Sequence, residues 1–246
     1  MKSIPLFLKL AACLMWLSGC AAIFQPKTTA PITFNSYGNT KDPKHICILL
    51  PGIRDRIGVF EKYGFIDIAQ PVLAQNPGTA LITVDAHWGY YRQRSIVKRL
   101  TKDIISQYPE AKISFVGASL GGFGSLLMAM ENPDRVENIV LLAPFLGEDD
   151  YSYLQRLRNQ GPIALAEDED LTLALSRVWQ FLLDPQRKIP ITIGYGTQDT
   201  FAPYYGFLMS QQAPLLHIQS TQGGHDWATW RKLWSRYARL TLVDPK

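Results

Sequence analysis

The chain has 246 residues, which fits one large domain, and its 47% hydrophobic and 19% charged residues are an ordinary globular balance. The formal net charge of +4 is small and the basic residues are scattered, which argues against a nucleic-acid-binding protein. The chain has no internal repeat and no low-complexity tract, so a repeat architecture and bulk disorder are excluded as well.

The first twenty residues differ from the rest of the chain. Lys2 opens them, an apolar run follows over residues 10–17, and small residues end the segment. This pattern is typical of a secretory signal, and the run is too short to span a bilayer comfortably. We therefore expect residues 1–19 to be a signal peptide, with an uncleaved anchor or an ordinary N-terminal helix as the alternatives.

The end of this segment, Leu17-Ser18-Gly19-Cys20, resembles a bacterial lipobox. That resemblance implies that Cys20 carries lipid such as palmitate, becomes the first residue of the mature chain and tethers the protein to a membrane of the cell envelope. Residues 20–44 are then the lipidated N-terminus and tether. Because residue 21 is not the aspartate associated with inner-membrane retention, the outer membrane is preferred if the source is Gram-negative.

Cysteine usage agrees with export. Cys13 would leave with the signal and Cys20 would be acylated, so Cys47 alone remains and no intramolecular disulfide can form. Cys47 lies in an apolar run, where we expect a small buried residue rather than a nucleophile.

From residue 45 onward, short apolar runs alternate with segments of helical spacing. Continuous apolar runs bounded by glycine, proline or charge are typical of strands buried on both faces of a mostly parallel sheet. Their alternation with helices predicts an α/β layered domain over residues 45–246. The expected strands span residues 46–50, 80–84, 113–116, 139–142, 191–195 and 215–219, with a first short strand near residues 32–34.

One connection, over residues 147–190, is longer than a single crossover needs. Its apolar residues recur at roughly helical spacing, which predicts two or three helices. One of them would be the ordinary crossover, and we expect the rest to form a small helical cap over the edge of the sheet.

The sharpest motif is Gly117-Ala118-Ser119-Leu120-Gly121. It lies between the expected strand 113–116 and an expected helix over 123–130, and a G-x-S-x-G in that place is typical of a nucleophile elbow. A serine at such a turn has a strained backbone, and its hydroxyl is held above the sheet. We predict Ser119 as the nucleophile. A phosphate-binding loop fits less well, because the spacing matches neither G-x-G-x-x-G nor a Walker loop.

A serine hydroxyl needs a base, and that base needs an acid to orient it. Among His45, His87, His217 and His225, only His225 lies in a glycine loop after the last strand, at the edge where α/β folds assemble their sites. Asp199 follows the strand at 191–195 and gives the order Ser, Asp, His. Asp85 is its competitor, and Asp226 is expected to cap the last helix.

The last helix is expected over residues 226–240. Its aromatic residues, Trp227, Trp230, Trp234 and Tyr237, fall on one face. Such a stripe favours core packing against the sheet, with a substrate platform at Trp227, close to His225, as the alternative.

Two backbone N–H groups are predicted to bind an oxyanion. One belongs to Leu120, directly after the nucleophile, and the other to Ile53, in the loop after the strand at 46–50. Arg54 and Arg56 in that loop are expected to lie on the surface or to pair with Asp55, and contact with an anionic part of the substrate is the alternative.

Together these residues resemble the α/β-hydrolase superfamily, through the elbow at residues 117–121, Asp199 and His225, over about residues 45–240. The stretch Gly224-His225-Asp226-Trp227, with Trp230, is similar to the esterase branch of antigen-85-type and S-formylglutathione-hydrolase-type enzymes. The family's first oxyanion motif usually begins His-Gly, whereas this chain has Pro51-Gly52. The resemblance implies a three-layer α/β-hydrolase fold.

We therefore expect a serine hydrolase that cleaves small-molecule carboxylic esters or thioesters through an acyl-enzyme. No cofactor is expected, and the absence of H-E-x-x-H and of clustered cysteines argues against a metal. The aromatic residues Trp88, Tyr90, Tyr91, Tyr204 and Tyr205 favour an apolar acyl or aromatic group in the substrate. An acyltransferase on the same fold and a non-catalytic, membrane-tethered binding protein remain the alternatives.

Overall fold

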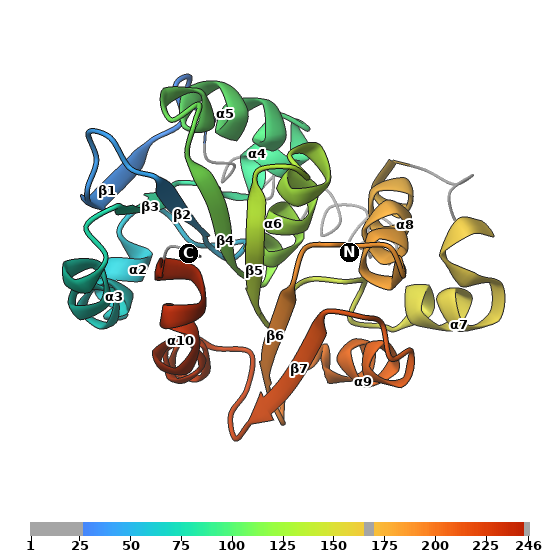
Figure 1. Cartoon of the computed structure of the whole chain (residues 1–246). Coiled ribbons are helices and arrows are strands. Elements are labelled where there is room, and N and C mark those ends of the chain that lie inside the picture. Colours follow the sequence, from blue (N-terminus) through green and yellow to red (C-terminus); the bar gives the residue numbers. More distant parts are fainter. Residues whose placement is uncertain (1–26, 165–169, 244–246) are drawn as a thin grey trace, which may run out of the picture.

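The computed structural model describes residues 27–164 and 170–243, so the expected signal peptide and Cys20 lie outside the described residues. Seven strands form one sheet in the order β1-β3-β2-β4-β5-β6-β7 (Figure 1). All neighbouring pairs are parallel except β1 with β3. The strands are β1 (Phe34–Gly38), β2 (His45–Leu50), β3 (Thr79–Val84), β4 (Lys112–Ala118), β5 (Val136–Leu142), β6 (Ile191–Gly196) and β7 (Leu216–Thr221).

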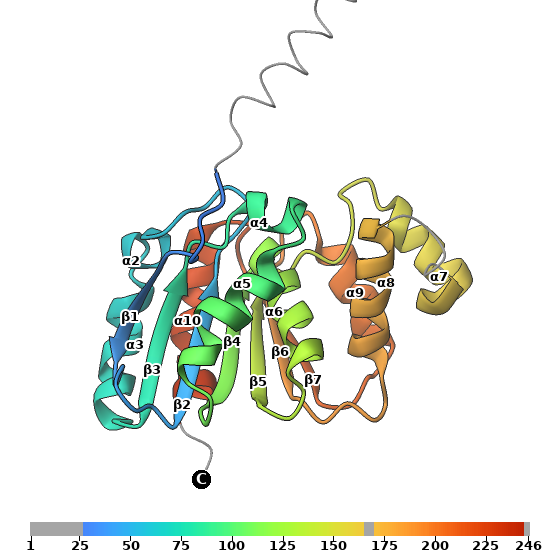
Figure 2. The ribbon, with the colours of Figure 1, turned by 90° about the horizontal axis from the view of Figure 1, so that it is seen from above.

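Helices cover both faces of this sheet. Figures 1 and 2 show α3 and α10 on one face and α5, α6 and α8 on the other, which is the three-layer α/β-hydrolase architecture expected from the sequence. The helices are α2 (Val59–Lys62), α3 (Phe65–Gln75), α4 (Trp88–Arg92), α5 (Ile96–Asp103), α6 (Leu120–Glu131), α7 (Ser152–Ala164), α8 (Asp170–Leu183), α9 (Ala202–Ser210) and α10 (Trp227–Leu242), with a 3-10 turn at Ile105–Gln107.

The folded domain begins earlier than the boundary expected at residue 45. β1 pairs with β3 from Phe34 to Gly38, two residues beyond the start expected for a first strand. Ile32 precedes it as a buried core residue, and its N–H donates to Asp103 Oδ2 (2.9 Å). The expected tether over residues 20–44 is therefore too long, because part of it belongs to the sheet.

The aromatic face of α10 packs into the core as expected. Trp230, Trp234 and Tyr237 are buried, and Trp234 Nε1 donates to the carbonyl of Phe65 in α3 (3.0 Å). Asp226 caps the helix, because its side chain accepts the N–H of Thr229 (2.8 Å). This packing fixes the loop that precedes α10.

The long connection over residues 147–190 contains α7 and α8. α8 is the crossover between the parallel strands β5 and β6, and it packs against α6. Its Trp179 is buried, donates to the carbonyl of Leu146 (2.9 Å) and contacts the ring of Tyr204 in α9. α7 packs against α8 at the outer end of the sheet (Figure 1).

Strand β2 lies in the interior of the sheet and all six of its residues are buried. Cys47 is among them, and burial raises the pKa of its thiol to about 12.

Within the described residues, no helix combines the length and the apolarity needed to cross a bilayer.

Candidate active site

Ser119 lies between β4 and α6, with φ 51° and ψ −116°. A positive φ is strained for a residue other than glycine and persists only where the surroundings hold it. Here the Ser119 N–H donates to the carbonyl of Leu142 (3.0 Å), and its own carbonyl accepts the N–H of Phe145 (2.9 Å). A side chain at Gly121 would collide with the carbonyl of Leu50, so glycine is required for α6 to start this close to β2.

A continuous chain of hydrogen bonds connects three of the predicted residues. His225 Nε2 lies 2.9 Å from Ser119 Oγ, and His225 Nδ1 lies 2.8 Å from Asp199 Oδ2. The other carboxylate oxygen of Asp199 accepts the N–H of Phe201 (2.8 Å). Because the buried carboxylate accepts from Nδ1, the neutral imidazole carries its proton there and leaves Nε2 as an acceptor for the serine hydroxyl.

Each member of this chain follows a different strand. Ser119 comes after β4, Asp199 after β6 and His225 after β7, so all three meet at the carboxyl edge of the sheet. The imidazole lies between two rings, with centroids 5.2 Å from Phe201 and 5.0 Å from Trp230, both in edge-to-face contact. These contacts restrict rotation of the ring and preserve its two hydrogen bonds.

The competing acid, Asp85, is occupied elsewhere. Its buried carboxylate accepts from Arg56 Nε (2.9 Å), Arg56 Nη2 (3.0 Å) and the N–H of Ile57 (2.8 Å). Arg56 is exposed, as one of the two expectations for it held, and its ion-pair partner is Asp85 rather than Asp55. Asp55 instead accepts from Trp227 Nε1 (3.3 Å), and burial raises the pKa of its carboxyl.

Two other histidines make structural contacts. His45 Nε2 bonds to the buried hydroxyl of Ser114 (2.8 Å). His87 caps α4 by accepting the N–H of Gly89 at Nδ1 (3.1 Å), and burial lowers the pKa of its imidazole.

The two predicted oxyanion donors both lie near Ser119. Leu120 is the first residue of α6, so its N–H has no acceptor within the helix. Ile53 lies in the turn after β2, where the N–H of Asp55 donates to the carbonyl of Gly52 (3.2 Å). Ile53, Leu120 and Ser119 all line the same cavity.

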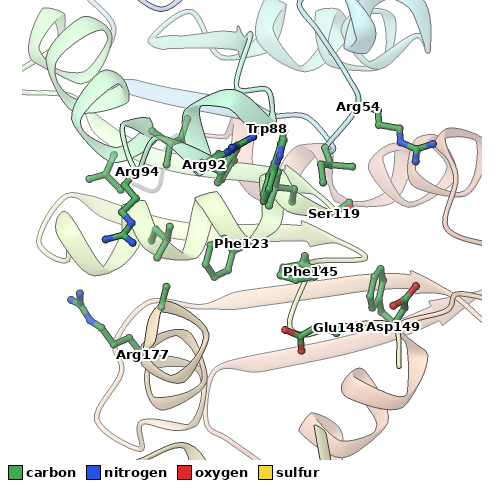
Figure 3. A pocket seen from close by; sticks show the side chains of 18 of the residues that line it. Arg54, Trp88, Arg92, Arg94, Ser119, Phe123, Phe145, Glu148, Asp149 and Arg177 are labelled. Carbon is green, nitrogen blue, oxygen red and sulfur yellow. The ribbon is translucent and has the colours of Figure 1, made fainter. Parts of the chain in front are cut away.

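That cavity has a volume of about 940 Å³, and Ser119 and His225 are among the residues that line it. Figure 3 shows Trp88, Phe123 and Phe145 around it, with charged side chains at its ends. Its apolar walls come from α4, α5, α6 and α8 and from the loop after β5, chiefly Trp88, Val97, Phe123, Leu127, Phe145 and Ala174. Such walls suit an apolar acyl chain.

Only two of the five aromatic residues expected near the substrate line this cavity, namely Trp88 and Tyr91. Tyr90, Tyr204 and Tyr205 are buried in the core, and their hydroxyls bond to Thr29, the Glu148 carbonyl and the Pro144 carbonyl. Sequence position alone does not tell which side of a helix turns inward, so proximity along the chain was misleading here.

A second hollow of about 610 Å³ lies on another side of Ser119 and His225. Trp227 lines it and stacks on Tyr63 with centroids 4.9 Å apart, and its expected alternative role as a substrate platform stays a prediction. Ser119 therefore borders two hollows, and a two-part substrate could place one part in each.

Sequence reasoning missed Phe145 and the first turns of α8. Phe145 directly follows β5 at the carboxyl edge of the sheet, in Ala143-Pro144-Phe145, and that position was a usable signal. The residues of α8 that line the cavity, Leu173, Ala174 and Arg177, gave no such signal, because only the packing of α8 on α6 brings them there.

Comparison with known proteins agrees with this architecture. The model of the Esterase family matches residues 84–237, more than half of the chain. An S-formylglutathione hydrolase from Staphylococcus aureus shares 17% identity, with 82% of this chain and 83% of that chain covered and a TM-score of 0.57. A carboxylesterase structure from Nitrososphaera gargenis shares 18% identity over 85% and 92% of the two chains, with a TM-score of 0.59. The chain belongs to the Esterase family and is a serine ester hydrolase of the α/β-hydrolase fold.

Proposed function

We propose that this enzyme cleaves carboxylic esters or thioesters of small molecules by acyl transfer, with Ser119 as nucleophile, His225 as base and Asp199 as the acid that orients it. The observation that carries the proposal is the chain of hydrogen bonds from Ser119 Oγ through the imidazole to the Asp199 carboxylate, at 2.9 and 2.8 Å. A serine hydroxyl becomes an effective nucleophile only when a base is within this distance.

In the first half of the reaction, Ser119 Oγ attacks the carbonyl carbon while His225 Nε2 takes the hydroxyl proton. The carbonyl oxygen gains the negative charge, and the imidazolium is stabilised by the Asp199 carboxylate. When the C–O or C–S bond to the leaving group breaks, His225 returns the proton to the departing alcohol or thiol. The product of this half is an ester of Ser119 with the acyl group.

In the second half, water attacks the acyl-enzyme and gives its proton to His225. The same imidazole then protonates Ser119 Oγ as the acid is released. In both halves the N–H groups of Leu120 and Ile53 would donate to the oxyanion, and removing such a donor typically costs about 10²–10³ in rate. Their positions at the start of α6 and in the turn beside Ser119 support this assignment.

The first experiment uses the chain without residues 1–20 and follows release of p-nitrophenol from acyl esters of several chain lengths. Ser119→Ala should abolish turnover, because among the described residues Ser119 supplies the one hydroxyl that hydrogen-bonds to the imidazole of His225. Ser125→Ala is a matched control, since this buried serine of α6 donates to the carbonyl of Gly121 (2.9 Å). Equal rates in Ser119→Ala and wild type, together with no labelling by a fluorophosphonate, would favour a binding protein instead.

Hydrolysis and transfer are separated by product analysis. With an added alcohol acceptor, a hydrolase should release mainly the free acid, and an acyltransferase should form mainly the new ester.

We further propose that residues 1–19 are a signal peptide and that lipid on Cys20 anchors the enzyme in the cell envelope, the outer membrane being preferred. The support is the sequence pattern that ends in Leu17-Ser18-Gly19-Cys20. Expression in a Gram-negative host with labelled palmitate should give a labelled protein in the membrane fraction. The Cys20→Ala variant should lose the label, whereas an anchor that is never cleaved would keep both variants in the membrane without label.

A further inference from the structure

Exposed apolar side chains gather at the mouth of the large cavity. Seven large hydrophobic residues are exposed among the described residues, and three of them line this cavity: Ile53 (46% exposed), Trp88 (36%) and Leu173 (40%). They come from three separate segments, namely the loop after β2, the first turn of α4 and the first turn of α8. Such a gathering marks a surface that contacts an apolar partner.

The same mouth is rich in arginine. Arg54, Arg92, Arg94 and Arg177 line the cavity against two carboxylates, those of Glu148 and Asp149, which leaves an excess of two positive charges. Figure 3 shows Arg94 and Arg177 at one end, Arg54 at another, and Arg92 beside Trp88. Exposed apolar and cationic side chains together match a surface that is anionic outside and apolar within, as a bilayer with anionic lipids is.

The described chain also begins beside this mouth. Thr28 Oγ1 donates to Gln93 Oε1 (2.8 Å), and the N–H of Thr29 donates to the hydroxyl of Tyr90 (2.9 Å), so the N-terminal segment is fixed on α4 and the residue after it. Figure 2 shows that the segment leading into β1 begins next to α4. The helix that presents Trp88 and Arg92 to the cavity is thus the one on which the N-terminal segment is seated.

The length of chain before this point is short. Seven residues lead from Cys20 to Lys27, and seven extended residues reach at most about 25 Å. A lipid on Cys20 would therefore keep α4 near the bilayer. The docking surface does not depend on that lipid, because its own apolar and cationic side chains form it.

We propose that the docking rim, made of Ile53, Trp88, Leu173, Arg54, Arg92 and Arg177, binds the surface of a bilayer that contains anionic phospholipid. In this orientation the cavity opens toward the lipid, so an apolar ester enters Ser119's cavity from the bilayer without crossing water. Trp88 lies at the level of the headgroups, and the arginines pair with phosphates.

Vesicle binding tests this rim without any turnover. The chain without residues 1–20 keeps the whole sheet and every helix that the structure describes, so it is expected to fold. It should sediment with vesicles of phosphatidylcholine and phosphatidylglycerol (1:1) and remain free with pure phosphatidylcholine. Raising NaCl from 0.05 to 0.5 M should release most of it, because salt screens exposed charges.

Two double variants identify the surface. Arg92→Gln/Arg177→Gln should weaken partitioning roughly thirtyfold, since each basic side chain near an anionic surface contributes about fivefold. Trp88→Ala/Leu173→Ala should weaken it as well. Two matched control variants change exposed residues away from the cavity and should bind like wild type. They are Lys232→Gln/Arg236→Gln on α10 and Met209→Ala/Leu240→Ala.

Three outcomes would overturn the proposal. The first is wild-type protein that stays free with both vesicle types, and the second is a control pair that loses as much binding as the rim pairs. The third is a wild-type protein that binds no vesicles but forms a dimer in sedimentation velocity, and a Trp88→Ala/Leu173→Ala variant that is monomeric. That result would mean that the rim binds a second copy of the chain. None of them depends on Ser119, so the proposed acyl transfer is tested separately.

Discussion

Asp199 and Asp226 both lie near His225, but the backbone conformation directs their carboxylates to different partners. Asp226 adjoins His225 in sequence, but its extended conformation (φ −146°, ψ 163°) turns its carboxylate to the N-terminus of α10. Asp199 is 26 residues away in sequence and lies 2.8 Å from His225 Nδ1. Adjacency along the chain is therefore a poor guide to which acid orients an imidazole.

Removing the Asp199 carboxylate, which we propose orients the imidazole, should lower kcat while leaving the fold intact. Asp199→Asn still offers an oxygen to the N–H of Phe201, but it favours the wrong tautomer of His225. We expect kcat for a p-nitrophenyl ester to fall by roughly 10³–10⁴. An unchanged kcat with an unchanged thermal midpoint would contradict the role given to Asp199.

The helix cap at Asp226 should contribute stability in a pH-dependent way. The hydrogen bond from the Thr229 N–H holds the pKa of this carboxyl below its usual value of 3.8. A lowered pKa in the folded state means that the contribution is present above the ordinary pKa and is lost as the pH falls through the folded one.

Asp226→Ala should accordingly lower the free energy of unfolding by about 1 kcal/mol at pH 7. Urea unfolding at pH 7, 5 and 3.5, followed by tryptophan fluorescence, should show the difference between variant and wild type shrinking at the lowest pH. The same loss at every pH would mean that the ionised cap is not its source.

At the scale of elements, the five interior strands were predictable, whereas of the two edge strands β7 was predicted and β1 was predicted only in part. Each interior strand is a continuous apolar run, because both of its faces are covered by helices. β1 reads Phe-Asn-Ser-Tyr-Gly and is partly exposed. Because of its polar residues it has no continuous apolar run, and only Phe34 fell within the expected strand. The turn at Ser119 was predictable because the close approach of α6 to β2 requires glycine at a fixed position, Gly121.

Helix α8 connects the core with the cavity. Its Trp179 is buried against α9, while Ala174, five residues earlier, lines the cavity. The spacing of apolar residues predicted helices in residues 147–190. In the structure, α8 is the helix of this stretch that lines the cavity. None of the residues described in α7 lines the cavity.

Filling this wall should change acyl preference. Ala174→Phe should lower kcat/KM for p-nitrophenyl decanoate by about tenfold or more relative to the acetate, because the added ring takes the space of a long chain. Ala213→Phe, outside the cavity, is the control. If the two substrates respond equally to Ala174→Phe, the acyl chain binds elsewhere, and the smaller hollow beside Trp227 becomes its site.

At the scale of the whole molecule, the site is assembled from segments far apart in sequence. The three residues of the proposed catalytic chain could be named from the sequence because each lies shortly after a strand, in a recognisable turn or glycine loop. The docking rim and the cavity walls could not, because they depend on which helix surfaces come together when the layers pack. Sequence thus predicts the chemistry better than the shape that receives the substrate.

Cys47, fully buried in the centre of the sheet, is the single thiol of a chain that starts after residue 20. Its raised pKa keeps it protonated, and a protonated, enclosed thiol does not react with disulfide reagents. Labelling of Cys47 therefore requires β2 to separate from its neighbouring strands. The labelling rate then measures how often the central sheet opens. Its rate should rise with urea in parallel with unfolding, and a ligand that binds only the native state should slow it in proportion to its occupancy.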